Sequence, residues 1–499
     1  MDAAVTREAV REKTPAEAVG AGCRPRPFFG RYHGVGNESF LRDVQKRDGA
    51  LSSGRMFQKQ LLTGRGFMSA PPSARQVALD LLASVLRLRR PLDDAIEESR
   101  AMQELAGRDR AFARLLVATV LRRLGQIDVL INECLKSPLA PRAAAVHDIL
   151  RLGVAQLLFL RTPPHAAVAT SVDLADVRGF ASHKGLVNAV LRRLCIEGRE
   201  RAENQDAARL NTPDWLWQSW SNAYGKETAK AIALAHLKEA PLDLTLRDNA
   251  EEWCRKLQAT LLPTGSLRRS AGGAIAALPG YAEGAWWVQD AAASLPARLF
   301  GDLNGREVID LCAAPGGKTA QLALAGGRVT AIDRSPRRLE RLVANLERLG
   351  LPIAPLAVDA LAWRPSAAVD AVLLDAPCTT TGAIRRHPDV PHLKLPDDVA
   401  RLSVVQENLL RAALEMLRPG GTLVYCTCSL EPEEGGERIA ALLRNGAAAA
   451  RRPIAPGEFG IPPEWVTPEG DLRTLPCHLS EYDGLDGFYG ARLVKLDSP

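Results

Sequence analysis

The sequence predicts a multidomain chain in which an all-α helical domain precedes an α/β domain with a doubly wound, mostly parallel sheet. Its 499 residues exceed the size of one ordinary domain. Apolar residues recur at helical spacing from residue 73 to about 200, and short strands alternate with helices from about 303. We therefore divide the chain into an extension (1–72), a helical domain (73–200), a connecting subdomain (201–302) and the α/β domain (303–499).

The composition excludes several classes of protein. With 46% hydrophobic and 24% charged residues, the chain resembles globular proteins, and its net charge of +6 permits a phosphate-bearing partner without requiring one. No apolar run reaches the length of a membrane span and no secretory signal opens the chain, so we expect a cytoplasmic protein. The nine cysteines are scattered without a CxxC pair, which favours free thiols over disulfides or a metal site.

The first 72 residues mix charges with Gly and Pro and show no sustained period. Such a stretch buries too little apolar surface to offset its ordering entropy, so we expect a disordered extension. An alternative is that Met68 is the true start, because the residues after it lead directly into a helix.

The helical domain follows from repeated three- and four-residue steps between apolar side chains, such as Val77, Leu81 and Val85. Arginines stand between the apolar positions of these helices. They are Arg110, Arg114, Arg122, Arg123, Arg192 and Arg193. They fit either a solvated helix face or a stripe that binds RNA phosphates, and both interpretations stay open.

The connecting subdomain contains one predicted helix start and one predicted strand. Residues 211–214 (Asn-Thr-Pro-Asp) offer side chains that can cap a helix, and residues 242–246 alternate as a strand does. The spacing of Trp215, Trp217 and Trp220 favours a packed hinge over a platform for stacking bases.

In the α/β domain, five short apolar runs predict buried strands and two longer patterns predict helices. The strands are residues 308–311, 328–332, 354–358, 371–374 and 422–425, and the helices are 336–349 and 397–417. Alternation of this kind indicates a parallel sheet with helices on both faces. Ligands of such sheets bind beyond the carboxyl ends of the strands, where the motifs below fall.

A glycine-rich turn follows the first of these strands, in the motif DLCAAPGGKT at residues 310–319. Gly316 and Gly317 tolerate unusual backbone angles, so the backbone can approach a ligand closely. Amides at the start of the next helix can then face an anionic group such as a carboxylate. Alone the turn is a weak signal, since it is neither a dinucleotide fingerprint nor a Walker loop.

Three acids end successive strands of this domain, namely Asp333, Asp359 and Asp375. The acid after the second strand is well placed to accept hydrogen bonds from ribose hydroxyls. A single acid at a strand end is commonly a helix cap. Three acids at the ends of successive strands, after a glycine-rich turn, indicate a ligand site.

Two cysteines fall on the same edge, Cys378 in DAPCTTTG and Cys428 in YCTCS. A thiolate is a strong nucleophile, and its pKa falls near cations, for which Lys318, Arg385 and Arg386 are candidates. Cys426 lies two residues from Cys428 and, by our prediction, its side chain points into the core.

These motifs, with the late DGFYGARL, resemble the set found in the NOL1/NOP2/Sun family of RNA 5-methylcytosine methyltransferases. The helical domain resembles the NusB-like RNA-binding domain, and the pairing is the architecture of the bacterial RsmB (Sun) branch. The resemblance covers nearly everything after residue 70. It implies a Rossmann-like methyltransferase domain that uses S-adenosyl-L-methionine. It also implies 16S rRNA or an assembling small subunit as partner, and neither membrane nor metal.

The resemblance also implies roles for individual residues. The loop around S-adenosyl-L-methionine would comprise Cys312, Ala313, Ala314, Pro315, Gly316, Gly317 and Lys318. Asp333 would hold the ribose, Asp359 the adenine side, and Asp375 the methionine end or the target base.

In the same way, the resemblance assigns roles to the two cysteines. Cys428 would attack C6 of cytosine, and Cys378 would assist its release after methylation. In DNA cytosine methyltransferases the Pro-Cys cysteine is the nucleophile instead, so the assignment of Cys428 rests on family membership.

The chain departs from the family pattern at three positions. Thr379 stands where Ser is usual, Cys426 where Ala or Ser is usual, and Tyr489 where Phe is common. Each change is conservative in size, and none removes a reacting group.

Three alternatives compete with the enzyme on 16S rRNA. They are an inactive NusB-like RNA-binding factor, the same chemistry on tRNA or another rRNA site, and a redox protein using Cys426 and Cys428. The intact cysteines and acids argue against the first. Splayed alternate side chains in a strand argue against the last.

Overall fold

The computed structural model describes residues 72–270, 272–351 and 353–497. The predicted disordered extension therefore lies, apart from its last residue, outside the described residues. The described residues form one compact unit. No described helix is both long and apolar enough to cross a membrane.

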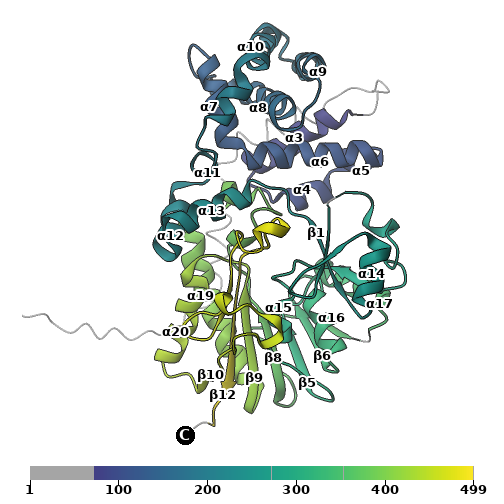
Figure 1. Ribbon diagram of the computed structural model, residues 1–499, viewed down its shortest axis with the longest axis vertical. Helices are drawn as coiled ribbons and strands as arrows, with labels where there is room; N and C mark the ends of the chain where they lie inside the picture. Colours follow the sequence, from purple (N-terminus) through teal and green to yellow (C-terminus); the bar gives the residue numbers. More distant parts are fainter. Residues whose placement is uncertain (1–71, 271, 352, 498–499) are drawn as a thin grey trace, which may run out of the picture. The chain divides into compact units, whose positions relative to one another are not determined.

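The N-terminal part is a helical domain, as predicted (Figure 1). Its α-helices are α3 (Ala74–Leu86), α4 (Leu92–Glu98), α5 (Arg100–Glu104), α6 (Gly107–Arg122), α7 (Leu124–Cys134), α8 (Ala144–Val154), α9 (Pro164–Val177) and α10 (Lys184–Glu203). Ser73 and Gln76 form a capping box that begins α3. The apolar side chains on the inner faces, among them Leu82, Leu116 and Ile149, are fully buried in one core.

The connecting region contains helices and a small antiparallel sheet. The helices are α11 (Ala207–Leu210), α12 (Asp214–Tyr224), α13 (Lys226–His236) and α14 (Ala250–Leu257). The strands are β1 (Leu242–Leu246), β2 (Thr260–Leu261), β3 (Leu267–Arg269) and β4 (Trp286–Val288), in the order β2-β3-β1-β4. The strand predicted at 242–246 is confirmed.

The predicted helix start at Asp214 is confirmed, but the predicted capping is wrong. No side chain caps α12. Asn211 instead donates to Gln126 of the helical domain, and the Thr212 hydroxyl donates backwards to the Ala208 carbonyl at 2.8 Å. Both side chains are therefore used for tertiary and local contacts before the helix begins.

Trp220, on the inner face of α12, is packed against other residues, as predicted by the interpretation that favours a packed hinge over a platform for stacking bases. Trp220 is buried, and its indole N–H donates to Glu431 at 3.1 Å. Trp215 and Trp217 lie at the edge of the same apolar cluster, and the Arg209 guanidinium stacks over the Trp217 ring.

The C-terminal part confirms the predicted α/β fold class. Its strands are β5 (Glu307–Leu311), β6 (Arg328–Asp333), β7 (Ala354–Ala357), β8 (Val369–Asp375), β9 (Leu417–Thr427), β10 (Ala449–Arg451), β11 (Leu472–Thr474) and β12 (Phe488–Lys495). The order is β10-β12-β9-β8-β5-β6-β7, and β11 pairs with β12. Strands β5 to β9 run parallel, whereas β12 joins β9 antiparallel.

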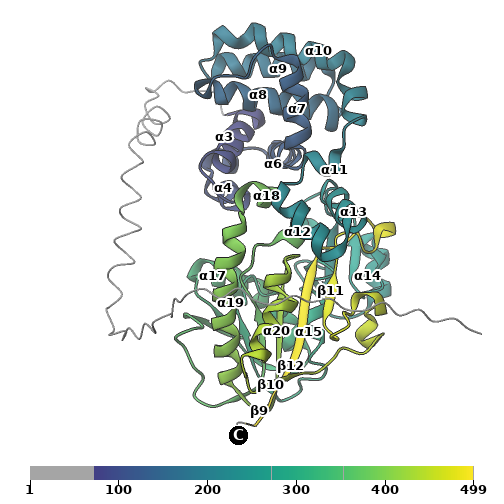
Figure 2. The same cartoon turned by 90° about the vertical axis from the view of Figure 1, so that its left-hand side faces the viewer.

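Helices cover both faces of this sheet, because alternate side chains of each strand point to opposite sides. They are α15 (Leu295–Arg298), α16 (Gly317–Leu324), α17 (Pro336–Arg348), α19 (Pro396–Met416) and α20 (Gly436–Arg444), with the short α18 (Val390–Leu393) before α19. Ile309 and Leu311 face the core with α19 and α20, while Val308 faces α15 and α16. Figure 2 shows α19 and α20 running alongside the sheet.

Candidate active site

The glycine-rich turn joins the carboxyl end of β5 to the start of α16. Gly316 has a φ of 100°, and a Cβ atom there would lie 3.1 Å from Leu342 Cγ, so this position requires glycine. Cys312 also has a positive φ, 62°. Burial raises the pKa of the Cys312 thiol to about 12, so the thiol stays protonated. Its role in the turn is therefore structural and not that of a nucleophile.

Asp333 ends β6 and is buried, with 3% of its surface exposed. Its Oδ1 accepts the Ser335 N–H at 2.9 Å. Its Oδ2 lies 3.2 Å from Arg338 Nη1 but accepts no hydrogen bond from any described residue. Since buried carboxylate oxygens are normally hydrogen-bonded, this oxygen is available to a ligand.

Asp359 lies two residues beyond β7 and is exposed. Its Oδ1 accepts the Leu361 N–H at 2.9 Å, so it stabilises the turn after the strand. Asp375, at the end of β8, pairs with Lys318 of α16 at 2.7 Å. Burial opposes the charge on Lys318, but Asp375, with smaller contributions from Cys426 and Cys428, outweighs burial and raises the pKa of Lys318.

Asp310 is a further acid of this edge that the sequence analysis did not select. Its Oδ2 accepts the Thr319 hydroxyl at 2.6 Å, and its buried Oδ1 has no partner among the described residues. Burial raises the pKa of its carboxyl to about 7. Its place near the carboxyl end of β5, the edge at which the other three acids lie, was the signal that could have identified it.

Cys378 and Cys428 meet across the ends of β8 and β9, with their Sγ atoms 3.5 Å apart. The hydrogen bond from the Cys378 thiol lowers the pKa of Cys428 below its usual range, against the effect of burial. The same hydrogen bond, together with burial, raises the pKa of Cys378 well above the usual value. Of the two thiols, Cys428 is therefore the more readily deprotonated. Cys426 is fully buried, as predicted, in the same apolar cluster that Cys428 borders, and its thiol donates to Asp375 Oδ1 at 3.5 Å.

The loop that carries Cys378 is fixed by Glu434, another residue that the sequence analysis did not identify. Both Glu434 carboxylate oxygens accept the Thr379 N–H at 3.1 Å, and the Thr379 hydroxyl also donates to one of them. Gln406 Nε2 donates to Glu434 at 3.0 Å and to the Pro377 carbonyl at 2.9 Å. These contacts fix the loop on both sides of Cys378.

Arg385 and Arg386 do not act as free cations beside the thiols. Arg385 donates to Asp486 at 2.8 Å and Arg386 to Asp290 at 2.5 Å, in a buried cluster that also includes Asp243. Their charges are balanced there by carboxylates. Of the three predicted cations, Lys318 is the one that lowers the pKa of Cys428, after the hydrogen bond from Cys378.

The arginines of the helical domain separate into two groups. Arg122 and Arg123 turn inward, where Arg122 donates to the Arg385 carbonyl at 3.0 Å and Arg123 stacks over Phe159. Neither the solvated-face nor the RNA-stripe interpretation therefore applies to these two. The other four bind neighbouring residues of their own domain through surface hydrogen bonds (Arg110, Arg114, Arg192 and Arg193). No group of His, Cys, Asp or Glu in the described ranges could hold a metal ion.

The thiol pair predicts a measurable pH effect. In Cys378→Ala, Cys428 loses the hydrogen bond that most lowers its pKa, so its alkylation by iodoacetamide should begin at a higher pH than in the wild type. Peptide mass spectrometry would follow Cys428 across a pH series, with exposed Cys195→Ala as the control. An unchanged or lower midpoint would show that Cys378 does not stabilise the thiolate.

Comparisons with known proteins agree with this architecture. The family model described as 16S rRNA methyltransferase RsmB/F matches residues 299–494, and the NusB family model matches residues 72–195. A ribosomal RNA small subunit methyltransferase B of Klebsiella pneumoniae (strain 342) is 33% identical over 445 residues, covering 84% of this chain and 98% of the relative. The protein of that name from Salmonella typhi is 35% identical over 415 residues, covering 79% of this chain and 92% of the relative.

A solved structure, that of the protein PH0851, has a similar fold. It aligns with a TM-score of 0.65 and covers 86% of this chain and 100% of its own. The sequence identity is 22%, so this likeness concerns the fold alone.

Proposed function

Because this chain belongs to the RsmB/F family of methyltransferases, with a NusB-family region before the catalytic domain, we propose that it forms 5-methylcytosine in small-subunit (16S) rRNA. The methyl donor in this proposal is S-adenosyl-L-methionine. The observation that carries the proposal is the thiol pair, in which Cys428 and Cys378 lie 3.5 Å apart with opposite pKa shifts. A methyltransferase that acted on an already nucleophilic atom would have no need of such a pair.

The residues present fit this cofactor. Asp333 offers the buried Oδ2 as an acceptor for a ribose hydroxyl, at the strand end where such acids bind ribose. The turn from Cys312 to Lys318 lets the backbone approach closely at Gly316, and α16 begins at Gly317 with amides that favour a carboxylate. Asp359 is assigned to the adenine side and Asp375 to the methionine ammonium or the target base. When bound, the cofactor supplies a methyl group on a positively charged sulfur.

The cysteines divide the remaining chemistry between them. The Cys428 thiolate adds to C6 of cytosine, which makes C5 nucleophilic and able to accept the methyl group. After methylation a water molecule takes the C5 proton, and the electron pair of the C5–H bond expels the Cys428 thiolate from C6. Cys378, protonated and in contact with Cys428, assists that release by its hydrogen bond to the departing sulfur. The target base must leave any stack to reach the pair.

The substrate assignment draws on the relatives, which are named small-subunit rRNA methyltransferases. Residues 72–195 match the NusB family, and their resemblance to an RNA-binding domain supports an RNA partner. The test is methyl transfer from labelled S-adenosyl-L-methionine to small-subunit rRNA made without modification, followed by nucleoside analysis of the product. Label in 5-methylcytosine supports the proposal. Transfer only to tRNA would overturn the substrate, and transfer to neither would favour a non-catalytic RNA-binding factor.

The cofactor assignment makes its own prediction at Asp333. In Asp333→Asn, the ribose loses a charge-assisted hydrogen bond, so the dissociation constant for S-adenosyl-L-methionine should rise about tenfold to a hundredfold. Titration calorimetry on the full chain would measure it. Asp302→Asn, in an exposed loop before β5, is the matched control. Unchanged affinity in Asp333→Asn would remove this residue from the cofactor site.

A further inference from the structure

Residues 385–393, which connect the Pro-Cys loop to α19, are contacted along most of their length by the helical domain. Figure 2 shows α18, part of this segment, next to α4. The contacts are Leu92 N–H to Asp389 Oδ2 at 3.0 Å, Arg122 Nη2 to Arg385 O at 3.0 Å, Arg89 Nη2 to Leu393 O at 2.9 Å, and His392 Nε2 to Leu121 O at 2.8 Å. Two of them end on backbone carbonyls of the segment and two on its side chains Asp389 and His392, so they hold both the path of the chain and these side chains.

The residues just before this segment are hydrogen-bonded to Cys428. The Gly382 N–H donates to the Cys428 carbonyl at 2.9 Å. The Arg386 N–H donates to the Ala383 carbonyl at 2.9 Å, which closes a tight turn between the two regions of contact. A shift of the backbone at Arg385 therefore moves Gly382, and with it the support of Cys428.

Among these contacts, the one made by Arg122 says most about the role of the segment, because this charged side chain is largely removed from solvent. Burial lowers the pKa of its guanidinium to about 10, so the group remains charged at neutral pH inside the protein. Its hydrogen bond among the described side chains and backbone goes to a neutral acceptor, the Arg385 carbonyl. The charge is partly buried with no carboxylate within ion-pair distance, although Glu239 stabilises it from farther away, so an apolar side chain would pack there at lower cost. The presence of an arginine at this position is explained by its hydrogen bond to the loop.

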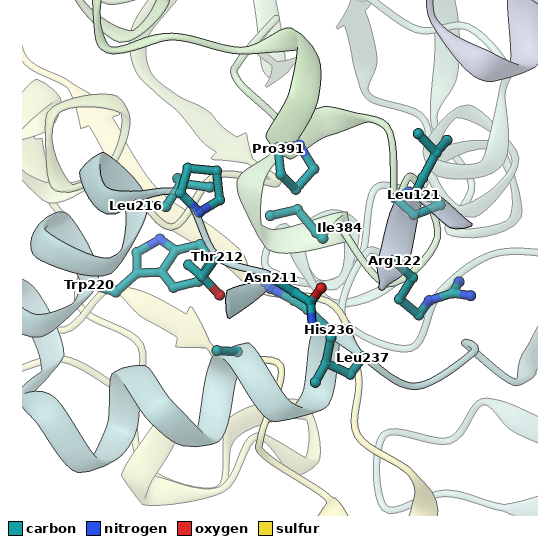
Figure 3. A pocket seen from close by; sticks show the side chains of 13 residues that line it. Leu121, Arg122, Asn211, Thr212, Leu216, Trp220, His236, Leu237, Ile384 and Pro391 are labelled. Carbon is teal, nitrogen blue, oxygen red and sulfur yellow. The ribbon is translucent and has the colours of Figure 1, made fainter. Parts of the chain in front are cut away.

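The packing around this contact leaves a pocket, shown in Figure 3. Leu121 and Arg122 line it from the helical domain, Ile384 and Pro391 from the loop side, and Trp220 from α12. Side chains that border a pocket lose dispersion contacts on that side. The polar contacts therefore restrain the loop together with the apolar packing of Ile384 and Val390 in the cluster around α12.

Resting on the proposed function, we propose that the helical domain is part of the catalytic apparatus, with Arg122 and Asp389 as positioning residues that hold the Pro-Cys loop and Cys428 in place. This role is separate from RNA binding. It requires that loss of either contact lowers the rate of the chemical step while affinity for RNA and cofactor is preserved.

The test compares full-length Arg122→Met with Arg108→Met, a change on the exposed part of the same helix. We expect kcat to fall about tenfold to a hundredfold in Arg122→Met, since small misplacements of reacting groups have effects of that size. KM for RNA should stay within about twofold of wild type, because no binding contact is removed. Arg122→Lys, which keeps a donor, should recover part of the rate, and Arg108→Met should match the wild type.

Iodoacetamide alkylation of Cys428 gives a readout that does not depend on methyl transfer. A changed alkylation rate in Arg122→Met and not in Arg108→Met supports the positioning role even if the rRNA substrate is wrong. Asp389→Ala, which removes the acceptor of Leu92, tests the second contact if Arg122→Met fails to fold. Unchanged kcat and alkylation in a folded variant would overturn the proposal, as would a raised KM for RNA with unchanged kcat.

Discussion

Replacing Cys428 by serine should abolish methyl transfer, with a loss of more than about a thousandfold, because a hydroxyl cannot supply the nucleophile that the thiolate provides. Cys378→Ser should behave differently. Its first step remains possible, but release of Cys428 from C6 loses the thiol that lies 3.5 Å from it, so a covalent adduct should accumulate. Labelled rRNA and denaturing gels would separate the two variants, since the adduct survives denaturation.

The opposite pattern has a clear meaning. If Cys378→Ser removes the adduct while Cys428→Ser traps it, the two thiols act in the order of the DNA enzymes, and the roles assigned here are reversed. Cys477→Ser, at a thiol of the apolar cluster around α12, serves as the control and should transfer methyl groups as the wild type does.

The parts of this site that lie within single motifs could be predicted from the sequence. A strand followed by a glycine-rich turn predicts both the position of Gly316 and the edge of the sheet at which ligands bind. The different burial of Cys426 and Cys428 could not be predicted from strand alternation, because side chains two residues apart in a strand lie on the same face. The proximity of Cys378 to Cys428 follows once β8 and β9 are neighbours.

The remaining parts depend on contacts between distant segments, which periodicity does not specify. Glu434 clamps the Pro-Cys loop from a turn after β9, and nothing in its local sequence distinguishes it from an exposed acid. Arg122 occupies an arginine-rich helix where neighbours of the same type point outward, so only the tertiary packing shows that it turns inward. The antiparallel addition of β12 to a parallel sheet is likewise decided by pairing with β9.

Arg385 also contacts residues far away in the sequence, and we expect its replacement to have the largest effect on stability. Its side chain is 1% exposed and donates to Asp486 at 2.8 Å and to the Asp483 carbonyl at 2.7 Å, with Asp290 at 3.3 Å. Arg385→Met would leave buried carboxylates with one cation fewer, a change that typically destabilises by about 3–5 kcal/mol. Thermal unfolding should show a midpoint several degrees lower. Arg418→Met, at an exposed pair with Asp370, should lower stability by no more than about 1 kcal/mol.

The pH dependence of this loss provides a second check. Burial and the nearby Asp290 already raise the pKa of Asp486, and removal of Arg385 raises it further. An acid with a raised pKa binds more protons in the folded than in the unfolded state, so stability falls as pH rises through that range. The deficit of Arg385→Met should therefore be smaller in mildly acidic buffer than at neutral pH. Adding Asp486→Asn should recover part of it, whereas equal deficits at both pH values would mean that the lost packing, and not the unpaired carboxylate, is the cause.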